Sequence, residues 1–526
     1  MFFGKKKKND SRKKQTEPLP PSSQKKEMPE QASDKTQKSE TISETTKTFI
    51  QDMSERVLSP ADLVVRNVSE KITIMFVDNL IKEDILNLKL LPALQNIMDE
   101  SPETIISQLP LPQINETSKM SECVDVMLTG AVVIHIEGHD CAILVIIPAR
   151  ESRGLTSPEN ESQVIGSQVG FNESLSTNIS LVRRYIANPN LGNEKFKVGK
   201  QTNTALSIMY IKGIVAEQNV NTIRQRIEAL DIQDIIDSTE LSELLDDNKL
   251  SFFPQMLTTE RPDRFCDGLL SGKVGILVDG SSMAILCPYS FIEFFQSRED
   301  KNLRWPIATF LRLLRFVAIL ISIFLTPLYV GALTFHYEVI PQSLLVPLSE
   351  SRARVPFPPI LEALFLELIM ELLREAGARL PTKIGQTIGI VGGIVLGTAA
   401  VQAGITSNIL IIIVALCALS SFITPSYMMG NVIRIVRFPI IIMAGFWGFY
   451  GIMLAFCILL IHLLRLTSLG APYLSPFYPP RIRSWGDSII RFPYRFTVRK
   501  SATTRVDGAE FSSKQDGQKN DGNVKE

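Results

Sequence analysis

The chain has 526 residues and 55 basic against 55 acidic side chains, so its formal net charge is zero. This length exceeds one domain of roughly 100–200 residues and predicts several domains. The balanced charge lacks the excess of cations that marks nucleic-acid-binding proteins, and we expect no nucleic acid among its partners. The six cysteines have no metal-ligand spacing, which predicts reduced packing residues and no metal.

Both ends of the chain have a polar composition that cannot bury an apolar core. Residues 1–47 are rich in Lys, Gln, Ser, Glu and Pro, and residues 471–526 are basic and then rich in Gly, Ser, Lys and Asp. We expect a disordered N-terminal tail and a largely disordered C-terminal tail. The run Lys5–Lys8 is either a solvated segment or an attraction to anionic lipid. No apolar stretch follows it, so we expect no signal peptide and a cytoplasmic first half.

Residues 48–300 have the pattern of a mixed α/β region. Ile72–Val77 is typical of a strand, and Ile81–Leu94 follows it with helical spacing. Val132–Ile136 and Cys141–Ile147 flank Glu137-Gly138, which predicts two strands joined by a tight turn.

The same series of strand, helix and hairpin recurs further along the chain. Leu206–Ile211 resembles the first strand, and Val274–Val278 with Met283–Leu286 resembles the hairpin. The matched positions are Gly130, Val132, Ile134, Gly138, Ala142, Ile143 and Leu144 with Gly272, Val274, Ile276, Gly280, Ala284, Ile285 and Leu286. We therefore predict two related α/β lobes, at 48–155 and 156–300, with chance similarity of two amphipathic hairpins as the alternative.

We find no set of residues in these lobes whose pattern predicts a catalytic site. His135 and His139 straddle the predicted turn, a poor arrangement for a metal. Arg261, Asp263 and Arg264 favour a structural network over catalysis. No nucleophile–base set and no Gly-rich phosphate loop is present, so we expect neither an enzyme nor a cofactor.

Residues 301–470 predict a helical membrane domain with about four spans. The candidate spans are Phe316–Thr334, Ile384–Val401, Ile405–Phe422 and Phe438–Leu464. Arginines and lysines flank the first and last spans, which places both ends in the cytoplasm and requires an even number of crossings. The last span is long and must tilt or protrude.

Glycines four residues apart mark one face of the second candidate span. These residues are Gly385, Gly389, Gly393 and Gly397. Small side chains let membrane helices approach closely, so we expect this face to pack against another helix.

An acidic helix between the first and second spans is the most informative segment. Pro356-Phe-Pro-Pro359 precedes Ile360–Ala376, whose acidic residues are Glu362, Glu367, Glu371 and Glu375. The last three form one stripe, which suits either a pore-lining or re-entrant helix, because carboxylates favour cations in pores. The alternative is an amphipathic helix at the membrane interface, with Glu371 and Glu375 paired to Arg374, Arg379 or Lys383. A full crossing would make five spans and contradict the placement of one end.

Several motifs resemble the A subunits of GerA-type spore germinant receptors. They are Ser251-Phe-Phe-Pro-Gln255, Thr259-Glu-Arg-Pro-Asp263, Pro341–Leu345, Ser351–Pro359, Glu371–Pro381, Ile384–Gly393 and Ser468-Leu-Gly-Ala-Pro-Tyr473. They occur in the family's order between about Ser174 and Pro476.

The resemblance implies a multi-pass protein of the spore inner membrane. It implies a transporter-like B subunit that binds the nutrient, a lipoprotein C subunit, contact with membrane lipid, and self-association into a ring that forms a nutrient-gated cation channel. The alternatives are a non-conducting scaffold or signal relay, and, less favoured, a membrane enzyme or transporter with a site between broken helices.

Overall fold

The computed structural model describes residues 40–57, 62–97, 101–149, 157–158, 161–379, 393, 395, 397–480 and 488–493. The described residues from Thr41 onward belong to one compact unit. Most of both predicted tails lies outside the described residues.

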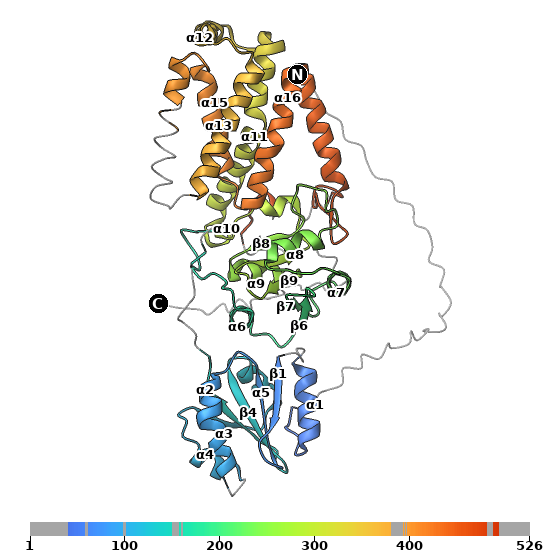
Figure 1. The fold of residues 1–526 in the computed structure, drawn as a ribbon. Helices are drawn as coiled ribbons and strands as arrows, with labels where there is room; N and C mark the ends of the chain where they lie inside the picture. The colour runs from blue at the N-terminus through green and yellow to red at the C-terminus, as the bar shows by residue number, and fades with distance from the viewer. Residues whose placement is uncertain are drawn as a thin grey trace, which may run out of the picture. The chain divides into compact units, whose positions relative to one another are not determined.

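The first lobe is a five-stranded antiparallel sheet with helices on both faces (Figure 1). Its strands are β1 (Leu63–Asn67), β2 (Ile72–Val77), β3 (Ile114–Thr117), β4 (Ala131–Ile136) and β5 (Ala142–Ile146), in the order β1-β2-β4-β5-β3. One face carries α1 (Thr46–Arg56) and α5 (Met120–Met127), and the other carries α2 (Glu83–Ile85), η1 (Leu86–Leu90), α3 (Leu91–Asn96) and α4 (Pro102–Gln108). Because both faces are covered, the two central strands are buried along their whole length.

The second lobe repeats this sheet with the same strand order. Its strands are β6 (Leu191–Val198), β7 (Thr204–Ile211), β8 (Leu257–Thr259), β9 (Val274–Val278) and β10 (Ala284–Cys287), in the order β6-β7-β9-β10-β8. Its helices are α6 (Leu175–Tyr185) and α9 (Pro262–Leu270) on one face, and α7 (Glu217–Glu228) and α8 (Ser238–Leu245) on the other.

The hairpin register confirms the predicted recurrence. Ile134 pairs with Ile143 in the first lobe, and the matched residues Ile276 and Ile285 pair in the second. The turn glycine has a positive φ in both hairpins, so a side chain there would be strained. The repeat found in the sequence is therefore a repeat of topology and of pairing.

Polar contacts join the two lobes at Asp62, which is 1% exposed. Its carboxylate accepts hydrogen bonds from Arg183 Nη2 and from Asn193 Nδ2, each at 2.7 Å. Lys195 Nζ lies 3.5 Å away. Among the described residues, the buried hydrophobic clusters of the first lobe contain no residue of the second.

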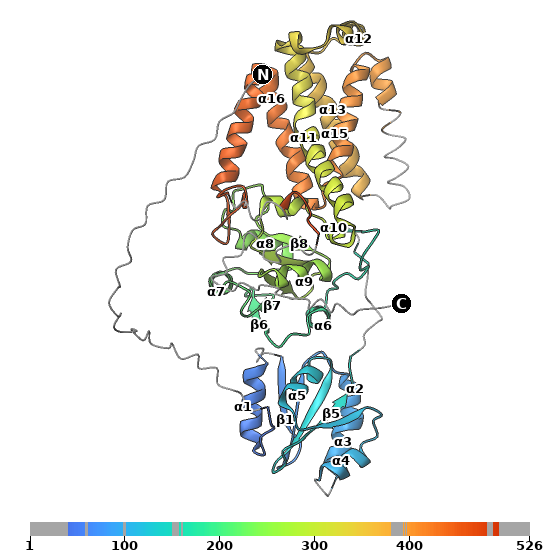
Figure 2. The same cartoon turned by 180° about the vertical axis from the view of Figure 1, so that it is seen from behind.

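Helices follow the second lobe. They are η2 (Phe291–Phe295), α10 (Glu299–Asn302), α11 (Trp305–Phe335), η3 (Tyr337–Val339), α12 (Gln342–Arg352), α13 (Pro359–Arg379), α15 (Asn408–Ser421) and α16 (Tyr427–Arg465). In the described residues, α11 and α16 are long and apolar enough to cross a membrane, and α15 is a shorter apolar helix. Figure 2 shows α11, α13 and α15 running alongside one another.

The predicted span Phe438–Leu464 is wrong, because α16 turns back on itself inside it. Gly448 has φ 58° and ψ −137°, which is not helical, and it lies against Phe335 and His336 at the end of α11. Both ends of α16 instead contact the second lobe: Thr258 Oγ1 donates to Met428 Sδ at 3.5 Å, and Ser251 Oγ bonds His462 Nε2 at 3.1 Å. Figure 1 shows the two legs, which we call the first leg (Tyr427–Trp447) and the second leg (Phe449–Arg465).

The other three predicted spans agree with the described helices to different extents. Phe316–Thr334 lies within α11, and Ile405–Phe422 contains α15, which begins only at Asn408. Most of Ile384–Val401 lies outside the described residues. A membrane domain of four spans is therefore not established by the described helices.

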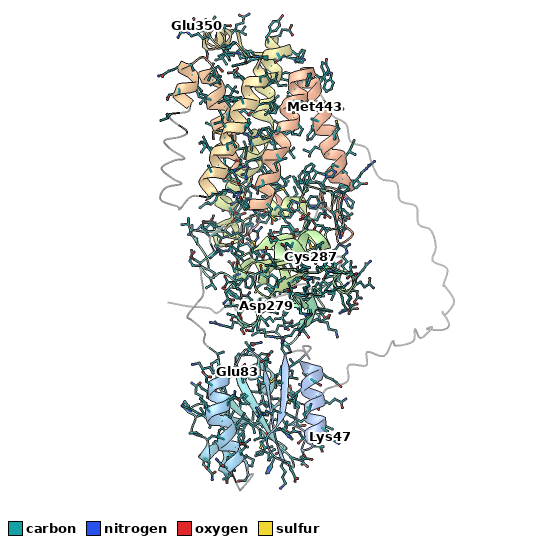
Figure 3. All side chains as sticks on the ribbon, in the orientation of Figure 1. Lys47, Glu83, Asp279, Cys287, Glu350 and Met443 are labelled. Carbon is teal, nitrogen blue, oxygen red and sulfur yellow. The ribbon has the colours of Figure 1, made fainter. Side chains whose placement is uncertain are left out.

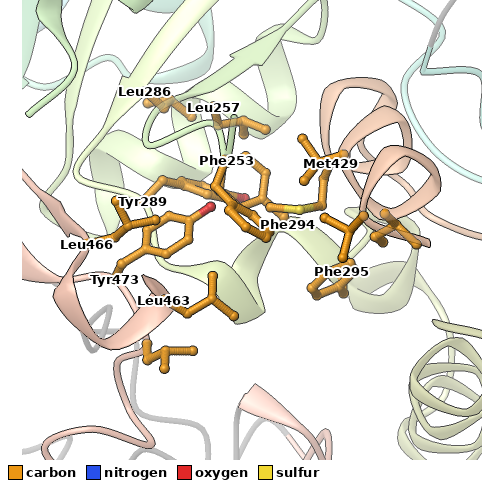
Figure 4. Close-up of a cluster of buried hydrophobic side chains, with 14 of the residues drawn as sticks. Phe253, Leu257, Leu286, Tyr289, Phe294, Phe295, Met429, Leu463, Leu466 and Tyr473 are labelled. Atoms are coloured by element: carbon orange, nitrogen blue, oxygen red, sulfur yellow. The ribbon is translucent and has the colours of Figure 1, made fainter. Parts of the chain in front are cut away.

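The second lobe and the helices share one hydrophobic cluster (Figure 4). Phe253, Leu257, Leu286, Tyr289, Phe294 and Phe295 of the lobe meet Met429, Leu463, Leu466 and Tyr473. Burial of one such side chain contributes about 1.5–3 kcal/mol. Figure 3 shows the side chains that fill the lobe around Cys287. It also labels Met443, which lies on the first leg of α16. The lobe and the helices are thus held together as one packed body.

A short hairpin after α16 also bonds to the second lobe. It consists of β11 (Thr467–Ser468) and β12 (Ala471–Pro472), so it crosses the predicted boundary between residues 470 and 471. Ser468 Oγ donates to Gln255 O, and Tyr473 Oη donates to Pro254 O, each at 2.6 Å. Two of the sequence motifs, Ser251–Gln255 and Ser468–Tyr473, therefore bind each other.

We expect Gly448→Ala to destabilise the helical hairpin. A Cβ at this position would lie 2.6 Å from His336 Cε1 and 2.9 Å from Phe335 Cβ, and the backbone conformation alone costs about 1–3 kcal/mol for a non-glycine residue. Thermal unfolding in detergent should show a clear drop in midpoint. Gly377→Ala on α13, where an added Cβ would have no described side chain or other segment within 4 Å, is the control and should leave stability equal or higher. Equal midpoints for both variants would contradict the turn.

Candidate functional site

Helix α13 buries its first two glutamates and exposes several of its apolar side chains. Pro358 precedes the first turn, and Leu361 N donates to Pro358 O at 3.0 Å. Glu362 and Glu367 are each 2% exposed. The exposed residues on this helix include Leu361, Phe365, Leu368 and Leu372. The carboxylates of Glu362 and Glu367 are thus placed among α11, α15 and α16 within the single chain.

Glu367 forms a buried ion pair with Arg437 of the first leg. Arg437 Nη1 lies 2.5 Å from Glu367 Oε2, and each side chain is 2% exposed. Thr326 Oγ1 donates to Glu367 Oε1 at 2.9 Å, and Arg437 Nη2 donates to Ser322 Oγ at 3.2 Å. These bonds tie α13 and α16 to the middle of α11. A low-dielectric surrounding makes such a pair strong when complete and costly when broken.

Glu362 caps the start of α15. Its Oε1 accepts hydrogen bonds from Ser407 N at 2.6 Å and Thr406 Oγ1 at 3.0 Å. Its Oε2 lies 3.5 Å from Arg352 Nη2 of α12. Tyr329 Oη of α11 bonds Ser407 Oγ at 3.1 Å, so four helices meet at this carboxylate. Ser407 is the N-cap of α15, since its Oγ accepts from Leu410 N at 3.3 Å, and the negative charge of Glu362 is favourable beside this helix N-terminus.

Glu371 and Glu375 lie nearer the surface and pair locally. Glu371 pairs with Arg374, and Arg434 Nε lies 3.9 Å from its Oε1. Glu375 pairs with Arg379 at 2.6 Å, with side chains 64% and 79% exposed. These are two of the pairs expected for an interfacial helix, while Lys383 lies outside the described residues. The predicted stripe therefore runs from the buried Glu367 to the exposed Glu375.

The described residues include two of the four glycines that were predicted to form a packing face. Gly385 and Gly389 lie outside the described residues. Gly393 and Gly397 have no described atom within 4 Å of an added Cβ. Any close packing of these two glycines therefore involves something other than the described residues of this chain.

Sequence reasoning missed the partners of the two buried glutamates. Arg437 immediately precedes the predicted span Phe438–Leu464. Arg352 is the last residue of α12, a short helix of low mean hydropathy. A usable signal was present, because an arginine beside a long apolar run is costly in a membrane and requires a partner.

A second cluster of charges lies where the second lobe holds the β11–β12 hairpin. Asp247 Oδ2 accepts hydrogen bonds from Thr467 Oγ1 and Gly470 N, and Asp247 Oδ1 lies 2.7 Å from Arg226 Nη2. Burial, with the adjacent charge of Asp247, raises the pKa of Asp246 to about 7. Hydrogen bonds to its charged form lower the pKa of Asp247 against the opposing effect of burial. The two neighbouring carboxylates therefore differ in protonation near neutral pH.

The remaining candidate residues have structural partners. His135 Nε2 lies 2.9 Å from Ser43 O, and its ring stacks on Phe49. Arg261 forms two bonds to Asp263, which supports the expected structural network. Across the described residues, no group of three His, Cys, Asp or Glu side chains is placed to hold a metal ion.

These features define a class of protein: a duplicated α/β region packed onto apolar helices that contain buried ion pairs. Residues 47–503 match the family described as Bacillus/Clostridium GerA spore germination protein. The chain belongs to this family, as its motifs indicated.

Relatives with high similarity carry spore germination names. The spore germination protein GerQA of Bacillus cereus is 44% identical over 87% of this chain and 92% of its own length. GerIA of Bacillus cereus is 43% identical over 88% and 70%, and spore germination protein KA of Bacillus subtilis is 38% identical over 85% and 84%. A solved structure, the N-terminal domain of the A subunit of the Bacillus megaterium germinant receptor GerK3, aligns over 48% of this chain and 97% of its own, at 23% identity and a TM-score of 0.38.

We expect the stability that the buried Asp246 contributes to the fold to decrease as pH rises toward 7. The folded chain keeps the Asp246 proton up to about pH 7, whereas an unfolded aspartate loses it near ~4. Stability should therefore fall between these values and level off above them. Thermal unfolding of the wild type at pH 5 to 8 should show this slope, and Asp246→Asn should flatten it. Asp231→Asn, at an exposed aspartate, is the control; an equal slope in Asp246→Asn would contradict the assignment.

We expect Arg437→Met to destabilise the helices by about 3–5 kcal/mol, because Glu367 is left charged and buried. Adding Glu367→Met should recover most of this loss, since two apolar side chains of similar volume replace the pair. Arg379→Met removes an exposed pair and should cost under about 1 kcal/mol. Thermal unfolding of the wild type, Arg437→Met, Glu367→Met and the double variant tests the cycle, with Arg379→Met as the control. Additive losses in the double variant would show that the two side chains do not interact.

Proposed function

We propose that this chain is the A subunit of a germinant receptor and acts in spore germination. Membership of the GerA family and similarity to germination proteins over most of the chain support this role. The proposed location is the spore inner membrane, with the lobes in the cytoplasm. In this proposal, residues 48–155 and 156–300 are the two lobes and 301–470 is the membrane domain.

The proposed partners are a B subunit that binds the nutrient, a lipoprotein C subunit and further copies of this chain. The exposed side of α13, with Leu361, Phe365, Leu368 and Leu372, offers an apolar surface to lipid or to a neighbouring copy. No described residue lies within 4 Å of a Cβ added at Gly393 or Gly397, and this suits close approach of another helix. Both surfaces favour assembly into a ring of A subunits.

We further propose that the ring is a nutrient-gated cation channel, and the carboxylates of α13 carry this proposal. A path between copies would first meet Glu371 and Glu375, which are accessible from outside the chain. Glu362 and Glu367 are enclosed by their partners, so a path reaches them only when these bonds open. Nutrient binding to a partner subunit would favour such an open state through a difference in affinity.

A non-conducting signal relay is the second candidate. The pairing of Glu367 with Arg437 and Thr326, and of Arg437 with Ser322, favours it, because these bonds stabilise one packed arrangement of the helices. In this role the chain would pass the signal from the nutrient-binding subunit to a separate channel.

The combined variant Glu371→Gln/Glu375→Gln distinguishes these candidates. If a cation path passes α13, loss of two charges should slow nutrient-triggered cation release several-fold while the receptor still assembles. Glu350→Gln, at an exposed glutamate on α12, is the matched control and should release cations normally. The measurement is potassium efflux from spores or from liposomes with the assembled receptor. Normal efflux and selectivity in the double variant would favour the relay.

A further inference from the structure

A short loop of the second lobe presents apolar side chains on a rigid turn. We call residues 248–252, Asn-Lys-Leu-Ser-Phe, the Leu250 loop. Asn248 Oδ1 accepts from Leu250 N at 3.1 Å, and Ser251 N donates to Asn248 O at 3.2 Å. Gln255, which is fully buried, bonds both backbone groups of Asn248 at 3.0 and 2.7 Å. The conformation of the loop is therefore set from inside the lobe.

This turn displays two neighbouring apolar side chains to solvent. Leu250 is 96% exposed and Phe252 is 54% exposed, with Lys249 exposed between Asn248 and Leu250. A fixed turn that holds a leucine almost fully outside the lobe gains nothing from it in water. Two apolar groups beside a cation are instead the composition of a segment that rests at a lipid surface.

The loop lies beside the end of the second leg. Ser251 Oγ and His462 Nε2 are 3.1 Å apart, and the rings of Phe252 and His462 stack with centroids 5.5 Å apart. The leg itself exposes apolar side chains at Ile461 and Leu464. The apolar surface of the loop thus continues the apolar surface of the helix.

Arg465 sets the depth of the loop. It is the first Lys or Arg after the apolar residues of the second leg, and a cation at the end of an apolar helix lies at the level of the lipid headgroups. His462 is three residues before Arg465, about 4.5 Å along the helix. The Leu250 loop, which contacts the leg at His462, is therefore level with the inner boundary of the bilayer.

We propose that the Leu250 loop inserts into the boundary between lipid headgroups and acyl chains. Leu250 and Phe252 contact acyl chains there, while Lys249 and Arg465 lie at the level of the phosphates. The insertion adds a direct contact between the second lobe and the bilayer to the contacts that the lobe makes with the helices. It rests on the membrane placement of α16 in the proposed function.

Fluorescence quenching by brominated lipid tests the insertion. A tryptophan replaces Leu250 in the full-length protein, whose three native tryptophans are changed to phenylalanine, in liposomes with bromine on the upper part of the acyl chains. Met453→Trp, at an exposed position of the second leg, is the control inside the bilayer. Leu88→Trp, at an exposed position of η1 in the first lobe, is the control in water.

We expect the emission of Leu250→Trp to be quenched by at least half as much as that of Met453→Trp, and that of Leu88→Trp to be unchanged. Quenching of Met453→Trp with Leu250→Trp at the level of Leu88→Trp would overturn the insertion and leave the span intact. Absence of quenching in Met453→Trp would instead contradict the membrane placement, and with it both the insertion and the proposed location.

Discussion

The continuous hydrophobic core between the second lobe and the helices is the constraint on which the rest of the structure depends. Side chains from β8, η2 and α16 belong to one buried cluster, so separating the lobe from the helices would expose large apolar surfaces to water. The bonds of Ser468 and Tyr473 to the lobe's Gln255 and Pro254 add direction to this packing. A rearrangement of the lobe must therefore be transmitted to both ends of α16.

The first lobe is connected in a different way. Asp62, Arg183 and Asn193 join it to the second lobe by hydrogen bonds and charge, and its hydrophobic clusters are its own. The Asp62–Arg183 pair is nearly fully buried, so leaving either charge without its partner is costly. The protein thus combines a hydrophobic junction next to the helices with a polar junction between the two lobes. Within the helices, Glu367 and Arg437 impose a similar choice between a complete pair and a costly broken one.

The sequence predicted those parts of the fold that local patterns determine. The hairpin around Gly138 and its counterpart around Gly280 were recognisable because glycine and strand spacing are both local. Edge strands such as β6, with the sequence Leu-Gly-Asn-Glu-Lys-Phe-Lys-Val, were missed because their polar faces carry no clear apolar alternation. The turn at Gly448 was missed because hydropathy is continuous across it. The glutamates of α13 and the local pairs of Glu371 and Glu375 were anticipated. The partners of the buried Glu362 and Glu367 were not, since Arg437 and Ser407 approach them only through the tertiary fold.

The distance between the second lobe and the C-terminal end of α16 tests most directly whether the lobe and the helices stay packed together. Spin labels at Lys212, which follows the β7 strand, and at Arg465 would report it by pulsed electron resonance in the assembled receptor, before and after addition of the activating nutrient. The shared core predicts one narrow distance distribution that does not change on activation. A shifted or broadened distribution would show that the lobe and the helix separate during signalling, and would contradict the account.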